Sequence, residues 1–135
     1  MSHLQKKSED LVKAANLLHG AGLFPAVAHS AYYCCVQLMK HIWLHSMKKT
    51  EMDLRERNKH SDKGRALGTH EFLISNIATF IYAKSTADFR TFSNDIGKLK
   101  KLRVNADYYD ETFNEKQSSE TLRISNKILP ILKKY

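Results

Sequence analysis

Residues 27–43 form the most apolar stretch of this sequence, and they constrain the fold more than any other segment. Of these 17 positions, 12 are apolar, aromatic or cysteine. Pro25, just before the stretch, suits the first turn of a helix, where its missing N–H does no harm. Gln37, Lys40 and His41 interrupt the stretch, so it is not expected to span a membrane. A helix that is apolar on nearly all sides must be covered on nearly all sides. We therefore predict either the central helix of a bundle or a helix with one face against a second copy of the protein.

The rest of the sequence reads as further amphipathic helices with few turn-forming residues between them. Five glycines and two prolines in 135 residues favour long helices over a many-stranded β fold. Apolar residues at helical spacing predict helices over residues 2–19, 24–49 and 69–84, a fourth beginning at Ser85 or Thr86, and a fifth beginning with a capping-box pattern at residues 112–115. We predict an all-α protein, an antiparallel up-and-down bundle of four or five helices in a single domain over residues 1–135.

Residues 46–68 break this helical pattern. Eleven of these 23 residues are charged, and Gly64 and Gly68 close the segment. Connections this long within a compact domain are usually functional or disordered. We predict a long mobile connection that includes a helical turn or two, followed by a helix with Thr69 as its N-cap.

The formal net charge is +8, which suggests an anionic partner such as nucleic acid, a nucleotide or an acidic protein. A soluble basic surface is the alternative interpretation. Cys34 and Cys35 are adjacent, and a disulfide between neighbours on a helix would need distorted geometry. They are expected to be buried reduced thiols, and charged residues near the start exclude an early apolar signal segment, so we expect a cytoplasmic protein.

Arg103 is the residue that departs most clearly from the helical pattern. Phe89, Ile96 and Arg103 follow one another at heptad spacing, so a guanidinium stands where an apolar side chain is expected. Burying an unpaired charge is costly, so this arginine needs a partner or an opening to water. Asp107, four residues later, could supply a purely structural ion pair. The functional alternative is an arginine held at a cleft or subunit interface to bind phosphate.

Histidine, tyrosine and lysine side chains supply the other candidates. His41 and His45 have the spacing of a shared metal site, but no third ligand is evident, and we expect neither a metal nor a cofactor. His29, Tyr32 and Tyr33 lie within about one turn of each other; they either pack in the core or face the Arg103 groove. A basic run that includes Lys100 either forms a phosphate-attracting rim or is a solvated face.

Three segments carry a resemblance to a known family. They read Gly-Leu-Phe-Pro-Ala at residues 22–26 leading into Ala-His-Ser-Ala-Tyr-Tyr at 28–33, Gly-Thr-His at 68–70, and Leu-Arg-Val-Asn-Ala-Asp-Tyr at 102–108. Their order and spacing resemble the HEPN domain, in particular small stand-alone prokaryotic members with an "Arg, two residues, Ala-Asp-Tyr" signature. The resemblance covers nearly the whole chain.

The resemblance implies an antiparallel helical bundle, a homodimer with its groove where two copies meet, and a link to RNA or nucleotides. Many HEPN proteins are metal-independent endoribonuclease toxins paired with a nucleotidyltransferase antitoxin. In active members a histidine follows the arginine after four to six residues. Here those positions hold Tyr108 to Asp110, and no histidine follows His70. The candidate catalytic residues are Arg103, Asp107 and Tyr108. The candidate ligand-binding or phosphate-binding residues are Arg103, Asn105, Tyr32, Tyr33, His29 and Lys100.

Three hypotheses follow from the sequence. The first is a HEPN-domain protein that binds RNA or a nucleotide in a toxin–antitoxin or defence-type system. The second is an active metal-independent ribonuclease that uses Arg103 with Tyr108, Asp107 or a distant His29. The third is a non-catalytic interaction module whose basic surface meets an acidic protein, with Arg103 in a structural role.

Overall fold

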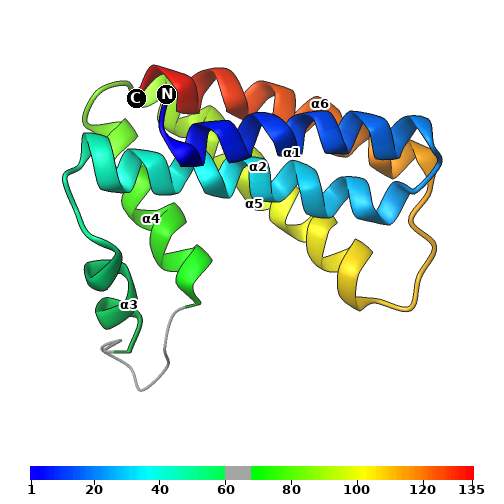
Figure 1. Cartoon of the computed structure of the whole chain (residues 1–135), viewed down its shortest axis with the longest axis horizontal. Coiled ribbons are helices and arrows are strands. Elements are labelled where there is room, and N and C mark those ends of the chain that lie inside the picture. The colour runs from blue at the N-terminus through cyan, green and yellow to red at the C-terminus, as the bar shows by residue number, and fades with distance from the viewer. Residues whose placement is uncertain (60–67) are drawn as a thin grey trace.

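The computed structural model describes residues 1–59 and 68–135 and is helical throughout, without strands in those ranges (Figure 1). The helices are α1 (His3–Gly20), α2 (Phe24–His41), a π-helical turn η1 (Ile42–Ser46), α3 (Glu51–Lys59), α4 (Thr69–Tyr82), α5 (Thr86–Tyr108) and α6 (Glu115–Lys134). Successive long helices α1, α2, α5 and α6 run in alternating directions, and α4 packs beside them (Figure 1). This confirms an all-α bundle.

The central position predicted for residues 27–43 is confirmed by their burial. Of the residues of α2, ten are buried, and α2 packs against α1, α4, α5 and α6. Cys34 and Cys35 are buried free thiols within it, as expected. The helix predicted to continue to residue 49 instead changes to a π-helical turn at Ile42 and ends at Ser46. No helix in the described part of the chain has the length and apolar character needed to cross a bilayer.

The connection between α2 and α4 contains more helix than predicted. Its first part forms the nine-residue α3, which raises the number of α-helices in the described ranges to six. Thr50 begins this helix by accepting a hydrogen bond from the Asp53 backbone N–H and donating its own N–H to the Asp53 carboxylate. Leu54 is buried while Met52 is exposed, so apolar periodicity gave little signal here. Residues 60–67 of the predicted mobile connection lie outside the described residues.

The helix caps explain where the elements that carry the site begin. Ser85 caps α5, accepting from the Asp88 backbone N–H, as one of the two predicted alternatives. Two other predicted caps are wrong. Gly68 occupies the N-cap position of α4, so Thr69 is already its first helical residue. Asn114 rather than Thr112 caps α6, because its side chain forms a capping box with Gln117.

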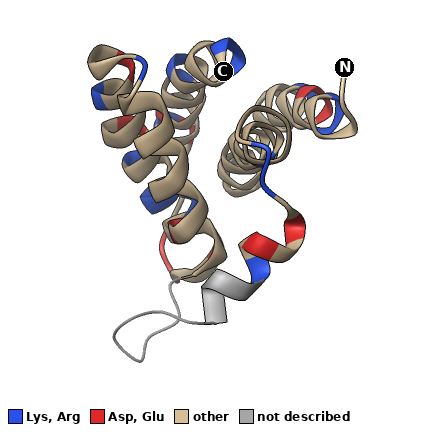
Figure 2. Cartoon of the chain, turned by 90° about the vertical axis from the view of Figure 1, so that its left-hand side faces the viewer, with Lys and Arg blue, Asp and Glu red and all other residues tan. Residues whose placement is uncertain are grey.

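Most charged residues in the described ranges are exposed or half-buried, and Asp95 and Arg103 are the buried ones. In the view of Figure 2, basic and acidic residues are interspersed along the helices and form no segment of one sign. Arg103 is therefore the buried cation around which a local anion site can be sought.

Candidate anion-binding site

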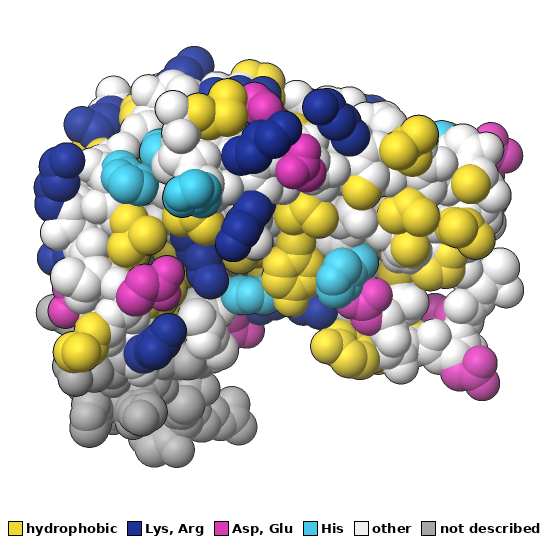
Figure 3. All heavy atoms as spheres, in the orientation of Figure 1, with side chains coloured by type: hydrophobic (Ala, Val, Ile, Leu, Met, Phe, Trp, Pro, Cys, Tyr) yellow, Lys and Arg dark blue, Asp and Glu magenta, His cyan; other side chains and the backbone are white. Residues whose placement is uncertain are grey.

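The candidate site lies where the middle of α2, the beginning of α4 and the last turns of α5 meet. Arg103 is on α5, which continues to Tyr108, so Asp107 follows one turn later on the same helix. Tyr32 and His29 come from α2. His70 comes from the first turn of α4. In the space-filling view, histidine side chains lie beside basic, acidic and apolar side chains near the middle of the visible face (Figure 3).

The Arg103 side chain is almost completely covered by aromatic rings. Arg103 is only 8% exposed. Its guanidinium carbon lies 5.1, 5.8 and 5.6 Å from the ring centroids of Tyr32, Tyr33 and Tyr108, respectively. Such cation–π contacts stabilise a guanidinium that has lost water. The ion pair with Asp107 is long, at 3.4 Å from Nη1 to Oδ2. The Nε atom is buried and has no hydrogen-bond partner among the described residues.

The environment keeps Arg103 charged. Burial acts to lower the pKa of the guanidinium, but a hydrogen bond with Tyr108, the two tyrosines of α2 and the bond with Asp107 outweigh it, so the pKa is raised. The site therefore contains a permanent cation whose hydrogen-bonding capacity is only partly used.

His29 shares the Asp107 carboxylate with Arg103. Its Nδ1 lies 3.2 Å from the same oxygen, Oδ2, that contacts the guanidinium. The imidazole also packs on Tyr33, with ring centroids 4.6 Å apart, and its side chain is 54% exposed. Asp107 therefore orients the imidazole, whose other nitrogen remains available to a ligand.

His70 is the site residue that the sequence analysis missed. Its Nδ1 lies 3.2 Å from the Tyr32 hydroxyl, and its ring contacts both Tyr32 and Tyr33. Burial, then the charges of Arg103, Lys100 and Lys40, lower the pKa of His70, so the imidazole is neutral near pH 7.

The Tyr32 hydroxyl can hold the His70 ring in place without losing its own proton. Burial raises the pKa of Tyr32 well above its usual value, although the charge of Arg103 acts to lower it. The protonated hydroxyl can donate to Nδ1 of the neutral imidazole. Nε2 then carries the imidazole proton and can donate to a phosphate. In the other tautomer Nδ1–H donates to the Tyr32 oxygen, and Nε2 is a free acceptor.

A hollow of about 330 Å³ opens beside these groups. It is lined by Gly68, Thr69, His70, Glu71, Lys100 and Arg103. Lys100 forms an ion pair with Glu71, at 3.1 Å from Nζ to Oε1. Arg103, Lys100 and His70 therefore face one opening, and hydrogen-bond donors on several elements that converge in this way are suited to a phosphate group.

The structure brings together most, but not all, of the predicted site residues. Arg103, Asp107, Tyr108, His29, Tyr32, Tyr33 and Lys100 lie in or around this site. Asn105 does not belong to it. It lines a separate hollow of about 250 Å³ with Gly97, Lys101, Val104, Tyr109 and Lys100.

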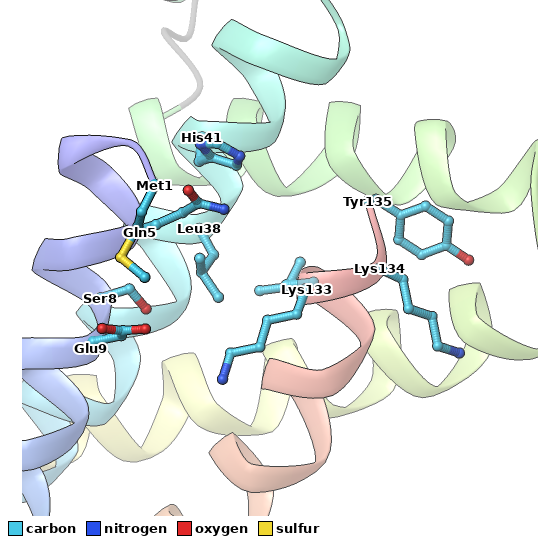
Figure 4. Close-up of a pocket in the computed structure, with 10 residues that line it drawn as sticks. Met1, Gln5, Ser8, Glu9, Leu38, His41, Lys133, Lys134 and Tyr135 are labelled. Carbon is cyan, nitrogen blue, oxygen red and sulfur yellow. The ribbon is translucent and has the colours of Figure 1, made fainter.

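A larger cavity at the other end of α2 offers a less suitable set of groups. It measures about 490 Å³ and is lined by residues of α1, α2 and the end of α6 (Figure 4). Lys133 and Glu9, of opposite charge, both line it, and Lys134 is already paired with Asp88.

The His41–His45 pair lies near this cavity. The centroids of the two imidazole rings lie 4.7 Å apart, and His41 Nδ1 contacts the Ser2 hydroxyl. In the described ranges, no three His, Cys, Asp or Glu side chains form a group that could hold a metal.

Comparison of the chain with protein-family models, curated proteins and solved structures gave no match. Function is therefore inferred from the geometry of the site.

Proposed function

We propose that this protein is a HEPN-type protein that binds RNA or a nucleotide by holding a phosphate at Arg103, in a toxin–antitoxin or defence-type system. The observation that carries the proposal is the Arg103 guanidinium itself. It is charged and 8% exposed, its Nε has no partner in the described part of the chain, and it lines an open hollow with Lys100 and His70.

The energetics of the arginine favour a ligand over a purely structural role. A buried guanidinium has to compensate for lost hydration with hydrogen bonds and ion pairs. Arg103 has a hydrogen bond with Tyr108 and a long contact, at 3.4 Å, with Asp107, which also contacts His29. Its Nε has no partner in the ranges that the structure describes. A phosphate in the hollow would supply oxygen acceptors to the remaining N–H groups. The planar guanidinium is well shaped to donate two parallel hydrogen bonds to such a phosphate.

The resemblance to HEPN proteins further supports a cytoplasmic homodimer with a nucleotidyltransferase partner. Tyr109, at the end of α5, is 56% exposed. Exposed aromatic side chains are common at protein interfaces. A second copy packed on this surface would place its own groups next to the Arg103 hollow.

Replacing Arg103 by methionine is expected to weaken binding of a single-stranded RNA oligonucleotide by about tenfold or more, because one charged, bidentate phosphate contact is lost. The slope of log affinity against log salt concentration should fall by about one. Fluorescence anisotropy at several salt concentrations measures both.

Two further variants make this test specific. Arg123→Met removes a charge from the exposed face of α6, where Arg123 pairs with Glu120, and should leave affinity nearly unchanged. Arg103→Lys keeps the charge without the planar fork and should recover only part of the binding. Unchanged binding in both Arg103 variants, with the fold intact by circular dichroism, would contradict the proposal and favour a structural arginine.

His70 supports a second candidate, a metal-independent endoribonuclease. In the tautomer whose Nδ1–H donates to the Tyr32 oxygen, Nε2 of the neutral imidazole is free and could accept the ribose 2′-OH proton as the oxygen attacks the adjacent phosphorus. Arg103 would stabilise the charge that develops on the phosphate. His29, which shares the Tyr33 ring with His70, could return a proton to the leaving 5′ oxygen. Incubation of the pure protein with RNA in EDTA tests this candidate, and intact RNA after long incubation removes it.

A further inference from the structure

We infer that the Arg103 hollow selects the phosphodiester link of a single-stranded nucleic acid over a terminal phosphate, and that Asp107 determines this specificity. The inference rests on the proposed function, which leaves RNA and free nucleotides as alternatives. It follows from the charges placed around the hollow and from the aromatic rings close to Arg103 and Asp107.

Both cations that line the hollow already have a carboxylate beside them. Lys100 pairs with Glu71 at 3.1 Å, and Arg103 pairs with Asp107 at 3.4 Å. Lys40 is a further cation close enough to act on His70. Three cations, Lys40, Lys100 and Arg103, and two carboxylates, Glu71 and Asp107, together carry a single net positive charge.

This balance matches a phosphodiester better than a phosphate monoester. A phosphodiester carries one negative charge, whereas a terminal phosphate carries about 1.5 to 2 at pH 7. The additional charge would lie next to the Asp107 carboxylate, because Asp107 contacts the same guanidinium that would bind the phosphate. Like charges at such distances repel one another, so Asp107 disfavours inorganic phosphate and mononucleotides.

The exposed rings beside Arg103 indicate a single strand. The Tyr108 ring lies 5.6 Å from the guanidinium carbon of Arg103, and the residue is 71% exposed. The half-exposed His29 ring packs on Tyr33 nearby. Exposed ring faces next to a phosphate site can stack with unpaired bases, which a duplex keeps inside its own stack.

Matched small ligands test the charge selection on the full chain. Adenylyl-3′,5′-adenosine contains one phosphodiester and no terminal phosphate, whereas AMP has the same base with a terminal phosphate. The wild-type protein is expected to bind the dinucleoside about tenfold more tightly than AMP or inorganic phosphate. Competition against a fluorescent 12-nucleotide RNA without terminal phosphates measures these affinities.

Asp107→Asn should bring the AMP affinity to within about twofold of the dinucleoside affinity, because the repelling charge is gone while an oxygen acceptor for Arg103 remains. Asp110→Asn is the matched control. Asp110 is an exposed carboxylate just beyond α5, and its replacement changes the net charge equally. This control should retain the wild-type preference.

The outcomes separate this inference from the proposed function. A wild-type protein that binds AMP or phosphate as tightly as the dinucleoside overturns the inference, while the proposed function stands. An unchanged preference in Asp107→Asn also overturns it. Failure of every ligand, including the 12-nucleotide RNA, to bind overturns the proposed function itself. If Asp107→Asn does not fold, the wild-type comparison still decides whether a phosphodiester is preferred.

Strand type is resolved in the same assay. The 12-nucleotide RNA, its DNA counterpart and the RNA duplex are compared as competitors. Tighter binding of either single strand than of the duplex supports the inference, and preferential binding of the duplex overturns it. Tighter binding of the RNA strand than of the DNA strand would further indicate that the protein contacts the ribose 2′-OH.

Discussion

Replacing Phe92 by alanine is expected to lower the free energy of unfolding by about 3–5 kcal/mol, the usual cost of deleting a buried phenylalanine ring. Phe92 is completely buried on α5 and belongs to the main hydrophobic core. The core cannot collapse fully around the missing ring, so a cavity penalty adds to the loss of apolar burial. Urea denaturation followed by circular dichroism measures the difference in unfolding free energy between wild type and variant.

Phe89→Ala on the same helix is the matched control for this prediction. Phe89 is only half-buried and contacts the exposed Tyr82, with ring centroids 5.1 Å apart. Its replacement should therefore cost less than half as much, since solvent already reaches part of the ring. Equal losses for the two variants would show that α5 does not face the core as described.

The parts of this fold that follow from local pattern could be predicted from the sequence. The nearly continuous apolar character of residues 27–43 required a helix covered on many sides, and α2 occupies that central position. Heptad spacing placed Arg103 on the inward face of its helix, and Asp107 lies one turn later with its carboxylate on the guanidinium. Both results depend only on helical periodicity.

The parts that depend on weak local signals were harder to predict. The helix α3 has one buried apolar residue among the described side chains, Leu54, so its periodicity could not be recognised. Thr69 and Thr112 are good capping residues by type. Asn114 is an equally good capping residue by type and forms its own capping box with Gln117, and Gly68 caps α4 without a side-chain hydrogen bond, so residue type alone does not choose between neighbouring positions.

The role of His70 could not be assigned from sequence because it depends on tertiary contacts with two other helices. One signal was nevertheless present. His70 precedes the buried Leu73 and Ile77 by three and seven residues, so it lies on the inward face of α4. The reasoning that singled out Arg103 as a polar residue in an apolar row applies equally to this histidine. Asn105, by contrast, was grouped with Arg103 by sequence proximity, but two residues along a helix point to nearly opposite sides.

If the protein cleaves RNA, His70→Asn is expected to lower the cleavage rate in EDTA by about 10²- to 10⁴-fold, because the group that accepts the 2′-OH proton is lost. Affinity for RNA should change by less than about threefold, since Arg103 still holds the phosphate. His45→Asn, which changes an exposed histidine paired with His41, should leave the rate unchanged.

The pH dependence gives a second signature of His70. Burial and neighbouring cations lower the pKa of His70 below 6.5, the ordinary value for histidine, so the imidazole stays neutral down to a pH below 6.5. The wild-type rate should fall as pH decreases through this lowered pKa, and the residual rate of His70→Asn should lack that step. The same shift affects stability. Because the unfolded chain binds the proton more readily, the contribution of His70 to stability is present above the unfolded pKa and is lost as pH falls through the folded pKa. If the cleavage rate of His70→Asn depends on pH as the wild-type rate does, another residue transfers the proton. If the rate of His70→Asn no longer falls at acidic pH and its RNA affinity is unchanged, His70 is the base.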